Sequence, residues 1–129
     1  MLTTTFKDGA FGSDPADLRH RVFPRLTGEN RDANIKLVTE FTKLAEAKGC
    51  STSQLALAWL IKQGNDVIPI PGTKKIKYLE DNWQTLKVDL TDEDEKSIRH
   101  FVETTEIAGE RLPDSVVHLT GGDTKEENV

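Results

Sequence analysis

The chain has 129 residues, of which 36% are hydrophobic and 30% charged, and its formal net charge is −5. This length fits one ordinary domain, and the negative charge argues against nucleic acid as the main partner, because phosphate backbones are bound by clustered positive charge. The single cysteine, Cys50, excludes a disulfide framework and a multi-cysteine zinc site. No run approaches the roughly 18 apolar residues of a membrane span, and no signal-peptide pattern is present, so we expect a cytoplasmic protein without membrane contact.

Residues 1–30 are punctuated by glycine and proline and show no apolar period, which predicts a long irregular segment. The first helix is expected at about 32–48, where apolar residues recur every three or four positions and therefore share one face. Asn30 is a candidate N-cap for this helix, and Gly49 suits the position that follows its last turn.

A second helix is expected at 53–63, with Ser51 or Thr52 as its cap. It is apolar nearly all round, which is typical of a helix that is buried on more than one side. The β-branched run at 66–70 then predicts a short buried strand. Because one strand cannot form a sheet, we expect the chain to pair with another chain or to belong to a larger α/β protein.

Two more helices are predicted, at about 75–85 and from Thr91 onward. The Thr91 hydroxyl precedes three carboxylates, a pattern that favours a helix start through capping and the helix dipole. Residues 106–129 lose the apolar period. The last of them, 118–129, are expected to form a disordered acidic tail.

The stretch that follows the predicted strand has the features of a phosphate site. Gly72 would let a ligand approach the backbone, and Thr73 offers a hydroxyl and an N-cap. Lys74, Lys75 and Lys77 place three cations at the start of a helix, where the dipole already favours an anion. The alternative is an ordinary capped helix with solvated lysines.

Three polar side chains follow in the same predicted helix. Asp81 and Asn82 can hydrogen-bond to an adenine or a ribose. Tyr78 lies on the same side of the helix, three and four residues earlier, where its ring could stack on a base. Ordinary packing is the alternative for Tyr78.

Two stretches, SQLALAWL at 53–60 and VIPIPGTKKIKYLEDN at 67–82, resemble the closing section of aldo-keto reductases. The resemblance extends over 1–117, which we therefore expect to be the C-terminal portion of an aldo-keto reductase domain. It implies an α/β fold, namely the C-terminal part of a (β/α)8 TIM barrel that is mostly helical within this chain. It also implies NADP(H) at the C-terminal face of the barrel.

The resemblance also assigns cofactor contacts. It implies that six positions bind NADP(H): Gly72, Thr73, Lys74, Tyr78, Asp81 and Asn82. The first three match the loop that holds the 2′-phosphate, and the fourth matches a position beside the adenosine that often carries arginine or glutamine. The last two match an acid–amide pair, most often Glu-Asn, that faces the adenine.

The chain differs from the family in its lack of the catalytic residues. The family's catalytic aspartate, tyrosine, lysine and histidine belong to earlier strands, and no segment of this chain matches their motifs. Tyr78 is the only tyrosine and falls in the predicted adenosine helix. The histidines at 20, 100 and 118 are isolated, so we predict no catalytic and no metal-binding residue.

The resemblance therefore implies an NADPH-dependent reductase that converts aldehydes or ketones to alcohols, with a small-molecule carbonyl as substrate. This chain would carry the adenosine-phosphate half-site without the catalytic tetrad. An inactive truncated module that binds a dinucleotide or a partner is the alternative, and another chain could cover its exposed core. A helix-turn-helix DNA binder has a passing likeness at 51–56, but the net charge of −5 argues against it.

Overall fold

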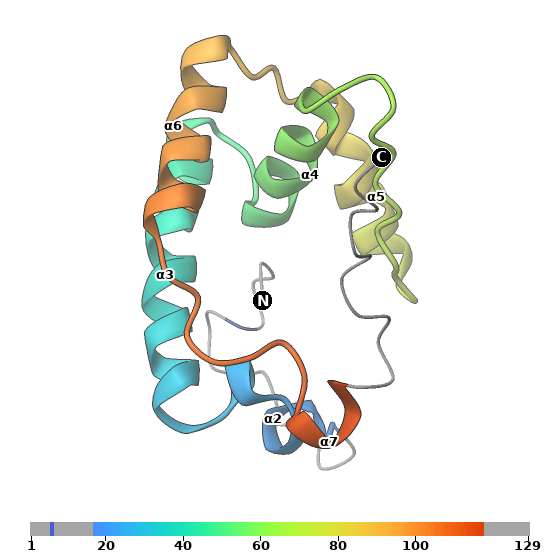
Figure 1. Ribbon diagram of the computed structural model, residues 1–129. Coiled ribbons are helices and arrows are strands. Elements are labelled where there is room, and N and C mark those ends of the chain that lie inside the picture. Colours follow the sequence, from blue (N-terminus) through green and yellow to red (C-terminus); the bar gives the residue numbers. More distant parts are fainter. Residues whose placement is uncertain (1–5, 7–16, 118–129) are drawn as a thin grey trace, which may run out of the picture.

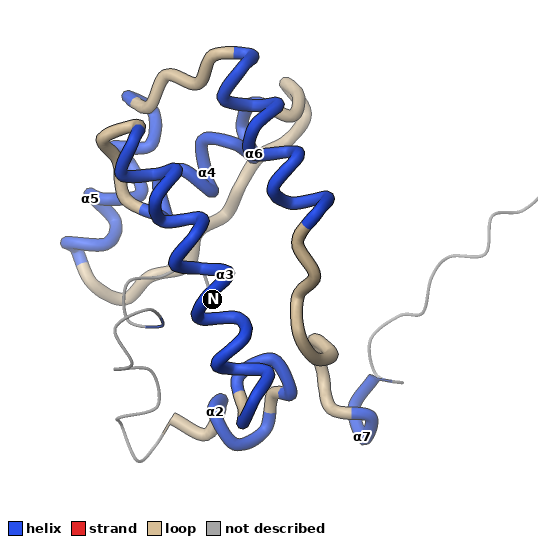
Figure 2. The backbone as a smooth tube through the Cα atoms, turned by 90° about the vertical axis from the view of Figure 1, so that its left-hand side faces the viewer, coloured by secondary structure: helices blue, strands red, loops and turns tan. Residues whose placement is uncertain are grey.

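The computed structural model describes Phe6 and residues 17–117, and within these residues the regular structure is helical, with no strand (Figure 2). The predicted tail at 118–129 lies outside the described residues. The elements in chain order are α2 (Arg19–Val22), the 3-10 turn η1 (Pro24–Leu26), α3 (Gly28–Ala47), α4 (Thr52–Lys62), α5 (Ile76–Gln84), the 3-10 turn η2 (Thr85–Lys87), α6 (Asp92–Thr104) and α7 (Asp114–Val117). None of these helices is long and apolar enough to cross a bilayer.

Helix α4 occupies the middle of the arrangement and packs against α3, α5 and α6 (Figure 1). The apolar residues that recur at helical spacing on α3 and α6 face this centre. The rings of Phe41 on α3 and Phe101 on α6 lie 5.6 Å apart between centroids. The buried core cluster consists of Phe41, Ala45, Leu55, Ala58, Leu90 and Ile98.

Helix α3 begins at Gly28, earlier than the predicted start at 32. The predicted N-cap, Asn30, is wrong, because Thr27 holds that position and provides no side-chain cap. The Asn30 amide instead donates to the Pro24 carbonyl at 3.2 Å and so serves the preceding 3-10 turn. The prediction that residues 1–30 are irregular is likewise wrong within the described part, where α2, η1 and the first turn of α3 lie.

The other helix boundaries agree closely with the sequence. Gly49 ends α3 with φ at +67°, a left-handed conformation that glycine adopts without the steric cost of a Cβ. Ser51 caps α4 in a reciprocal capping box with Gln54. Thr91 caps α6 in the same way with Asp94. In both boxes the side chains satisfy backbone N–H groups that the helix leaves without partners.

A buried asparagine ties the start of α3 to the segment after α6. Asn34 is fully buried, and its amide donates to the carbonyls of Arg25 and Ala108, both at 2.9 Å. Its carbonyl accepts the Ala108 N–H at 3.1 Å. The Arg25 guanidinium adds a bond to the Gly109 carbonyl at 3.0 Å. These hydrogen bonds hold the start of α3 against the segment that follows α6, two regions that no apolar sequence pattern connects.

The prediction of a strand at 66–70 is wrong, because this stretch is a loop in the structure. Ile68 and Ile70 are 80% and 92% exposed. A strand needs a neighbouring strand to receive its backbone hydrogen bonds, and the described residues provide none. The β-branched run therefore has strand propensity but no sheet to join.

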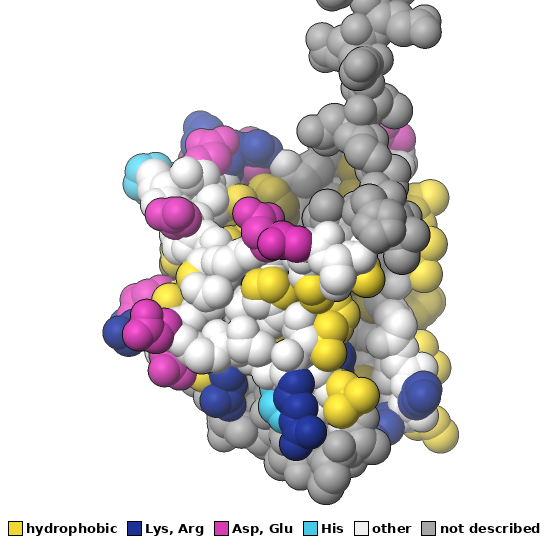
Figure 3. Space-filling model, turned by 60° about the horizontal axis from the view of Figure 1, so that its bottom comes forward, with side chains coloured by type: hydrophobic (Ala, Val, Ile, Leu, Met, Phe, Trp, Pro, Cys, Tyr) yellow, Lys and Arg dark blue, Asp and Glu magenta, His cyan; other side chains and the backbone are white. Residues whose placement is uncertain are grey.

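Helix α4 is also less enclosed than predicted. Leu55 and Ala58 are buried against α3 and α6, but Leu60 and Ile61 on its last turn are exposed. The apolar face of α5 is open as well, and Trp83 on it is 68% exposed. Figure 3 shows hydrophobic side chains along the right-hand edge, the side on which α5 and the preceding loop lie in Figure 1. The described part of the chain thus lacks the elements that would cover these surfaces.

Candidate functional site

The candidate phosphate loop is an exposed segment that leads straight into α5. All residues from 70 to 80 are exposed. A Cβ added at Gly72 would meet nothing within 4 Å, so the backbone there faces open space. Lys74, Lys75 and Lys77 are exposed around the same point. The loop therefore presents accessible backbone and positive charge together.

The Thr73 side chain folds back on the loop just before the helix. Its hydroxyl accepts the Lys75 N–H at 3.2 Å and donates to the Lys75 carbonyl at 3.3 Å. The predicted N-cap role of Thr73 is wrong, because Lys75 occupies the N-cap position of α5. Thr73 instead forms a local turn that shapes the approach to the helix.

The first turn of α5 has no side-chain cap. The backbone N–H groups of Ile76 and Lys77 find no acceptor among the described residues. Helices α4 and α6 both start in a capping box, whereas α3, like α5, has no side-chain cap. An uncapped first turn carries outward-pointing donors and the positive end of the helix dipole, the combination that binds phosphate groups.

Tyr78 lies on the same first turn and is partly covered by a lysine. The Lys75 ammonium lies 5.7 Å from the centroid of the Tyr78 ring, within the range of a cation–π contact. The Tyr78 side chain stays 45% exposed. The ring therefore stands beside the uncapped turn and is accessible to a planar ligand.

Asp81 and Asn82 are adjacent in sequence but differ in their surroundings. The Asp81 carboxylate accepts hydrogen bonds from Gln54 Nε2 at 2.9 Å and from the Ser51 hydroxyl at 3.3 Å. Gln54 Nε2 also donates to the Asp81 backbone carbonyl at 3.0 Å. The Asn82 side chain is partly buried and has no hydrogen-bond partner among the described residues. Asp81 is thus engaged by α4, whereas the Asn82 amide keeps its capacity for a ligand.

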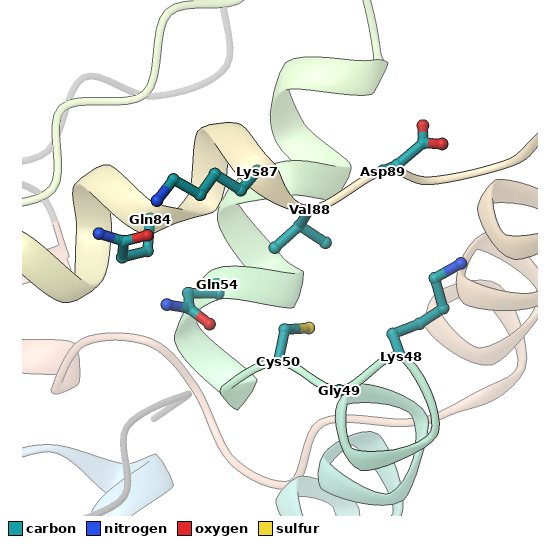
Figure 4. Close-up of a pocket in the computed structure, with 8 residues that line it drawn as sticks. All are labelled: Lys48, Gly49, Cys50, Gln54, Gln84, Lys87, Val88 and Asp89. Atoms are coloured by element: carbon teal, nitrogen blue, oxygen red, sulfur yellow. The ribbon is translucent and has the colours of Figure 1, made fainter.

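A separate hollow of about 400 Å³ lies where the α3–α4 connection faces the end of α5 (Figure 4). Its lining residues are Lys48, Gly49, Cys50, Gln54, Gln84, Lys87, Val88 and Asp89. Burial raises the pKa of the Cys50 thiol, an effect that Lys48 partly offsets. A thiol in that state is mostly protonated at neutral pH and is a poor nucleophile. None of the six predicted cofactor residues lines this hollow.

Groups that could hold a metal ion are not found among the described residues. The Arg19 guanidinium is bonded to the Asp17 carboxylate at 2.8 Å and holds the pKa of that carboxyl at about 2. Arg25 is committed to the Gly109 carbonyl. Both arginines are therefore already engaged within the described part of the chain.

Comparison with known proteins identifies the family to which the chain belongs. Residues 3–103 match the profile described as the Aldo/keto reductase family. The chain belongs to the aldo/keto reductase family. It is 44% identical over 112 residues to the aldo-keto reductase yakc [NADP(+)] of Schizosaccharomyces pombe, covering 84% of this chain and 33% of the relative.

Two further relatives support the same assignment. Aldo-keto reductase str7 of Strobilurus tenacellus is 38% identical, over 76% of this chain and 29% of the relative. The probable aldo-keto reductase 1 of Glycine max is 36% identical, over 87% of this chain and 32% of the relative. This aldo/keto reductase chain therefore spans about a third of the length of the curated relatives it matches. The family implies a TIM barrel, and the helical, strand-free structure of the described residues is consistent with a partial domain.

Sequence reasoning missed the role of Gln54. The spacing of Ser51 and Gln54 is that of a capping box, so the cap itself could be found. That both side chains also reach Asp81, about thirty residues later, could not be found, because no local pattern encodes that contact. The same applies to Asn34, whose partners lie at both ends of the described chain.

Proposed function

We propose that this chain forms the adenosine end of the NADP(H) site in an aldo-keto reductase. The observation that carries the proposal is the uncapped first turn of α5 behind an exposed Gly72 and Lys74. In this proposal the 2′-phosphate is held by the backbone and side chains of Gly72, Thr73 and Lys74 and by the α5 N–H groups. The name of the Schizosaccharomyces pombe relative, which includes NADP(+), supports the choice of cofactor.

The donor set fits a phosphate monoester. Two free N–H groups on one turn can point to the same anion, and three exposed lysines add charge around it. Tyr78 would then lie beside the adenosine, and the free Asn82 amide would be available to the adenine edge. The cofactor would supply a hydride to the carbonyl carbon of an aldehyde or ketone.

The groups for the chemistry itself are proposed to lie outside this chain. Tyr78 is the only tyrosine of the sequence, and it stands on the cofactor-binding turn. We expect no turnover of a carbonyl substrate by this chain alone. A carbonyl substrate for the whole enzyme is proposed from the family resemblance, and the cytoplasmic location that we expect from the sequence stays a proposal.

We further propose that another polypeptide segment, on the same or a second chain, covers the open apolar surface. Ile68, Ile70 and Trp83 are each more than two-thirds exposed, and the loop at 66–70 has strand propensity without a neighbour. An inactive module that binds a dinucleotide or a partner through these surfaces is the second candidate function. Addition of the rest of the barrel would separate these two candidate functions. Carbonyl reduction by the completed barrel would support the reductase, and its absence would support the inactive module.

The test of the proposed site is a fluorescence titration of the 129-residue chain with NADPH and with NADH. The chain should bind NADPH more tightly, because only NADPH carries the 2′-phosphate. Lys74→Ala should weaken NADPH binding about three- to tenfold and leave NADH binding unchanged. Lys36→Ala, which removes an exposed lysine from α3, is the matched control. Equal affinities for both dinucleotides, or no binding of either, would contradict the proposal.

A further inference from the structure

The segment that follows α6 is held in the corner between η1 and α3 by a ring of hydrogen bonds. The Asn34 amide donates to the Arg25 and Ala108 carbonyls, and its own carbonyl accepts the Ala108 N–H. The Arg25 guanidinium closes the ring with its bond to the Gly109 carbonyl. Figure 1 shows this segment leaving the end of α6 and running beside α3 toward α7. We call residues 105–113 the latch segment.

Gly109 fits this corner for two separate reasons. Its φ of +79° is left-handed, a conformation that glycine adopts without the steric cost of a Cβ. A Cβ added at this position would also meet the side-chain nitrogen of Asn30 at 2.5 Å and the backbone carbonyl carbon of Pro24 at 3.2 Å. The Asn30 side chain could turn aside, but the Pro24 backbone could not. The latch segment therefore lies directly against η1 at a point where only glycine fits.

The latch segment is held by polar contacts and not by a buried apolar side chain. The described side chains from 105 to 116 are at most partly buried, and Ile107 is 44% exposed. On α4, in contrast, Leu55 and Ala58 are buried in the core. A broken hydrogen bond is largely replaced by bonds to water, whereas an exposed apolar side chain has no such compensation. The latch segment should therefore separate from the helices at a lower free energy than the core unfolds.

We propose that the latch segment opens and closes as a local unit on a helical core that stays folded, and that Asn34 is the residue that holds it closed. Opening breaks the bonds of Asn34 to Ala108 and of Arg25 to Gly109. It thereby exposes one amide donor of Asn34 and the Arg25 guanidinium. The inference is independent of the proposed cofactor site, because these bonds join the latch segment to η1 and α3 and not to α5.

Amide hydrogen exchange of the isotopically labelled 129-residue chain at increasing low urea concentrations tests the inference. The Ala108 N–H reports on the latch segment, because its acceptor is the Asn34 carbonyl. The Ala58 N–H reports on the core. Ala108 should exchange at least tenfold more slowly than an unstructured peptide, at least tenfold faster than Ala58, and at a rate nearly independent of urea, because local opening exposes little surface. Exchange at Ala108 that follows Ala58 with urea, or that equals that of an unstructured peptide, would overturn the inference.

Gly49→Ala weakens the core and leaves the latch segment unchanged. Gly49 is left-handed at the end of α3, and an added Cβ there meets nothing within 4 Å, so the substitution adds backbone strain alone. This strain is released when the core unfolds but not when the latch segment opens. Exchange at Ala58 should therefore become about fivefold faster, and exchange at Ala108 should not change. Equal acceleration at both amides would show that the latch segment opens only with the core.

Asn34→Asp weakens the latch contact itself at constant side-chain size. The new carboxylate keeps an acceptor for the Ala108 N–H but loses both amide donors. Exchange at Ala108 should become about tenfold faster, and Gly109→Ala should accelerate it as well, because the added Cβ meets the Pro24 backbone. Asn65→Asp makes the same change at an exposed site and is the matched control. Unchanged exchange at Ala108 in Asn34→Asp would show that Asn34 does not hold the segment closed.

Discussion

The starts of α4 and α5 are built in opposite ways. At α4, Ser51 and Gln54 satisfy each other's backbone N–H groups, and their remaining donors are taken by Asp81. At α5, Lys75 occupies the N-cap position with no side-chain cap. The first arrangement bonds the third N–H of the helix to a side chain, whereas the second has no side-chain cap and is surrounded by exposed lysines. The comparison shows two uses of a helix start, since side-chain caps add stability and exposed first-turn donors with nearby charge suit an anion.

The largest effect on the free energy of unfolding is expected from removing the cap at the start of α4. Ser51→Ala removes the hydroxyl that accepts the Gln54 N–H and donates to Asp81. The free energy of unfolding should fall by about 1–2 kcal/mol, the typical cost of losing an N-cap. Urea unfolding followed by circular dichroism measures this. Ser97→Ala on the exposed side of α6 is a serine control without a capping role, and a loss as large in that variant would contradict the account.

The next largest effect is expected from adding a side-chain cap at the start of α5. Lys75 has β-region backbone angles, φ −120° and ψ 131°, that suit a capping residue. Lys75→Ser should therefore raise the free energy of unfolding by about 0.5–1 kcal/mol. The same change should weaken NADPH binding, because the new hydroxyl competes for the free N–H groups and one cation is lost.

The test measures both the free energy of unfolding and the NADPH affinity of Lys75→Ser. The free energy of unfolding should rise, and the NADPH affinity should fall. If Lys75→Ser gains stability and keeps its full affinity, the free N–H groups of α5 do not bind the phosphate. Lys75→Ala, which removes the charge without adding a cap, separates the two contributions.

A smaller effect concerns the other capped helix, α6. The Lys48 ammonium, 2.6 Å from the Asp94 carboxylate, and the Thr91 hydroxyl hold the pKa of Asp94 at about 2, below its usual 3.8. The folded state therefore binds this proton less readily than the unfolded state. The stability that Asp94 contributes is complete above about pH 4 and is lost as the pH falls toward 2.

The acid unfolding of Asp94→Asn tests that dependence. The difference in unfolding free energy between the unsubstituted chain and Asp94→Asn should shrink as the pH falls from about 4 to 2. Comparison with the unsubstituted chain cancels the other acids in this range, such as Asp17, whose pKa is also about 2. A difference that stays constant across the window would show that Asp94 does not titrate with the cap.

The sequence predicts the helices well where the signal is local. Thr91 with Asp94, and Ser51 with Gln54, are spaced three residues apart, and both caps form in the structure. Gly49 ends α3 because its left-handed φ is open to glycine at little cost. These features depend only on residues within one or two turns, so an amino-acid pattern contains them.

Prediction from sequence fails where a distant partner decides the outcome. The run at 66–70 has the composition of a strand but forms a loop, because a strand requires neighbours that the described residues lack. Asn30 has the residue type of a cap, but its amide bonds to Pro24 instead. At the candidate site the lysines and Gly72 could be predicted, whereas the contact of Asp81 with α4 depends on how α4 and α5 pack.

The most direct test of the proposed phosphate site is the backbone amide spectrum of the isotopically labelled chain during titration with adenosine 2′-monophosphate. Resonances of Ile76 and Lys77 should shift most, together with those of the loop at 72–75, and adenosine at the same concentration should leave them in place. Resonances at the capped starts of α4 and α6 should not move. Shifts that are equal for both compounds, or that appear at the capped helices instead of α5, would contradict the account.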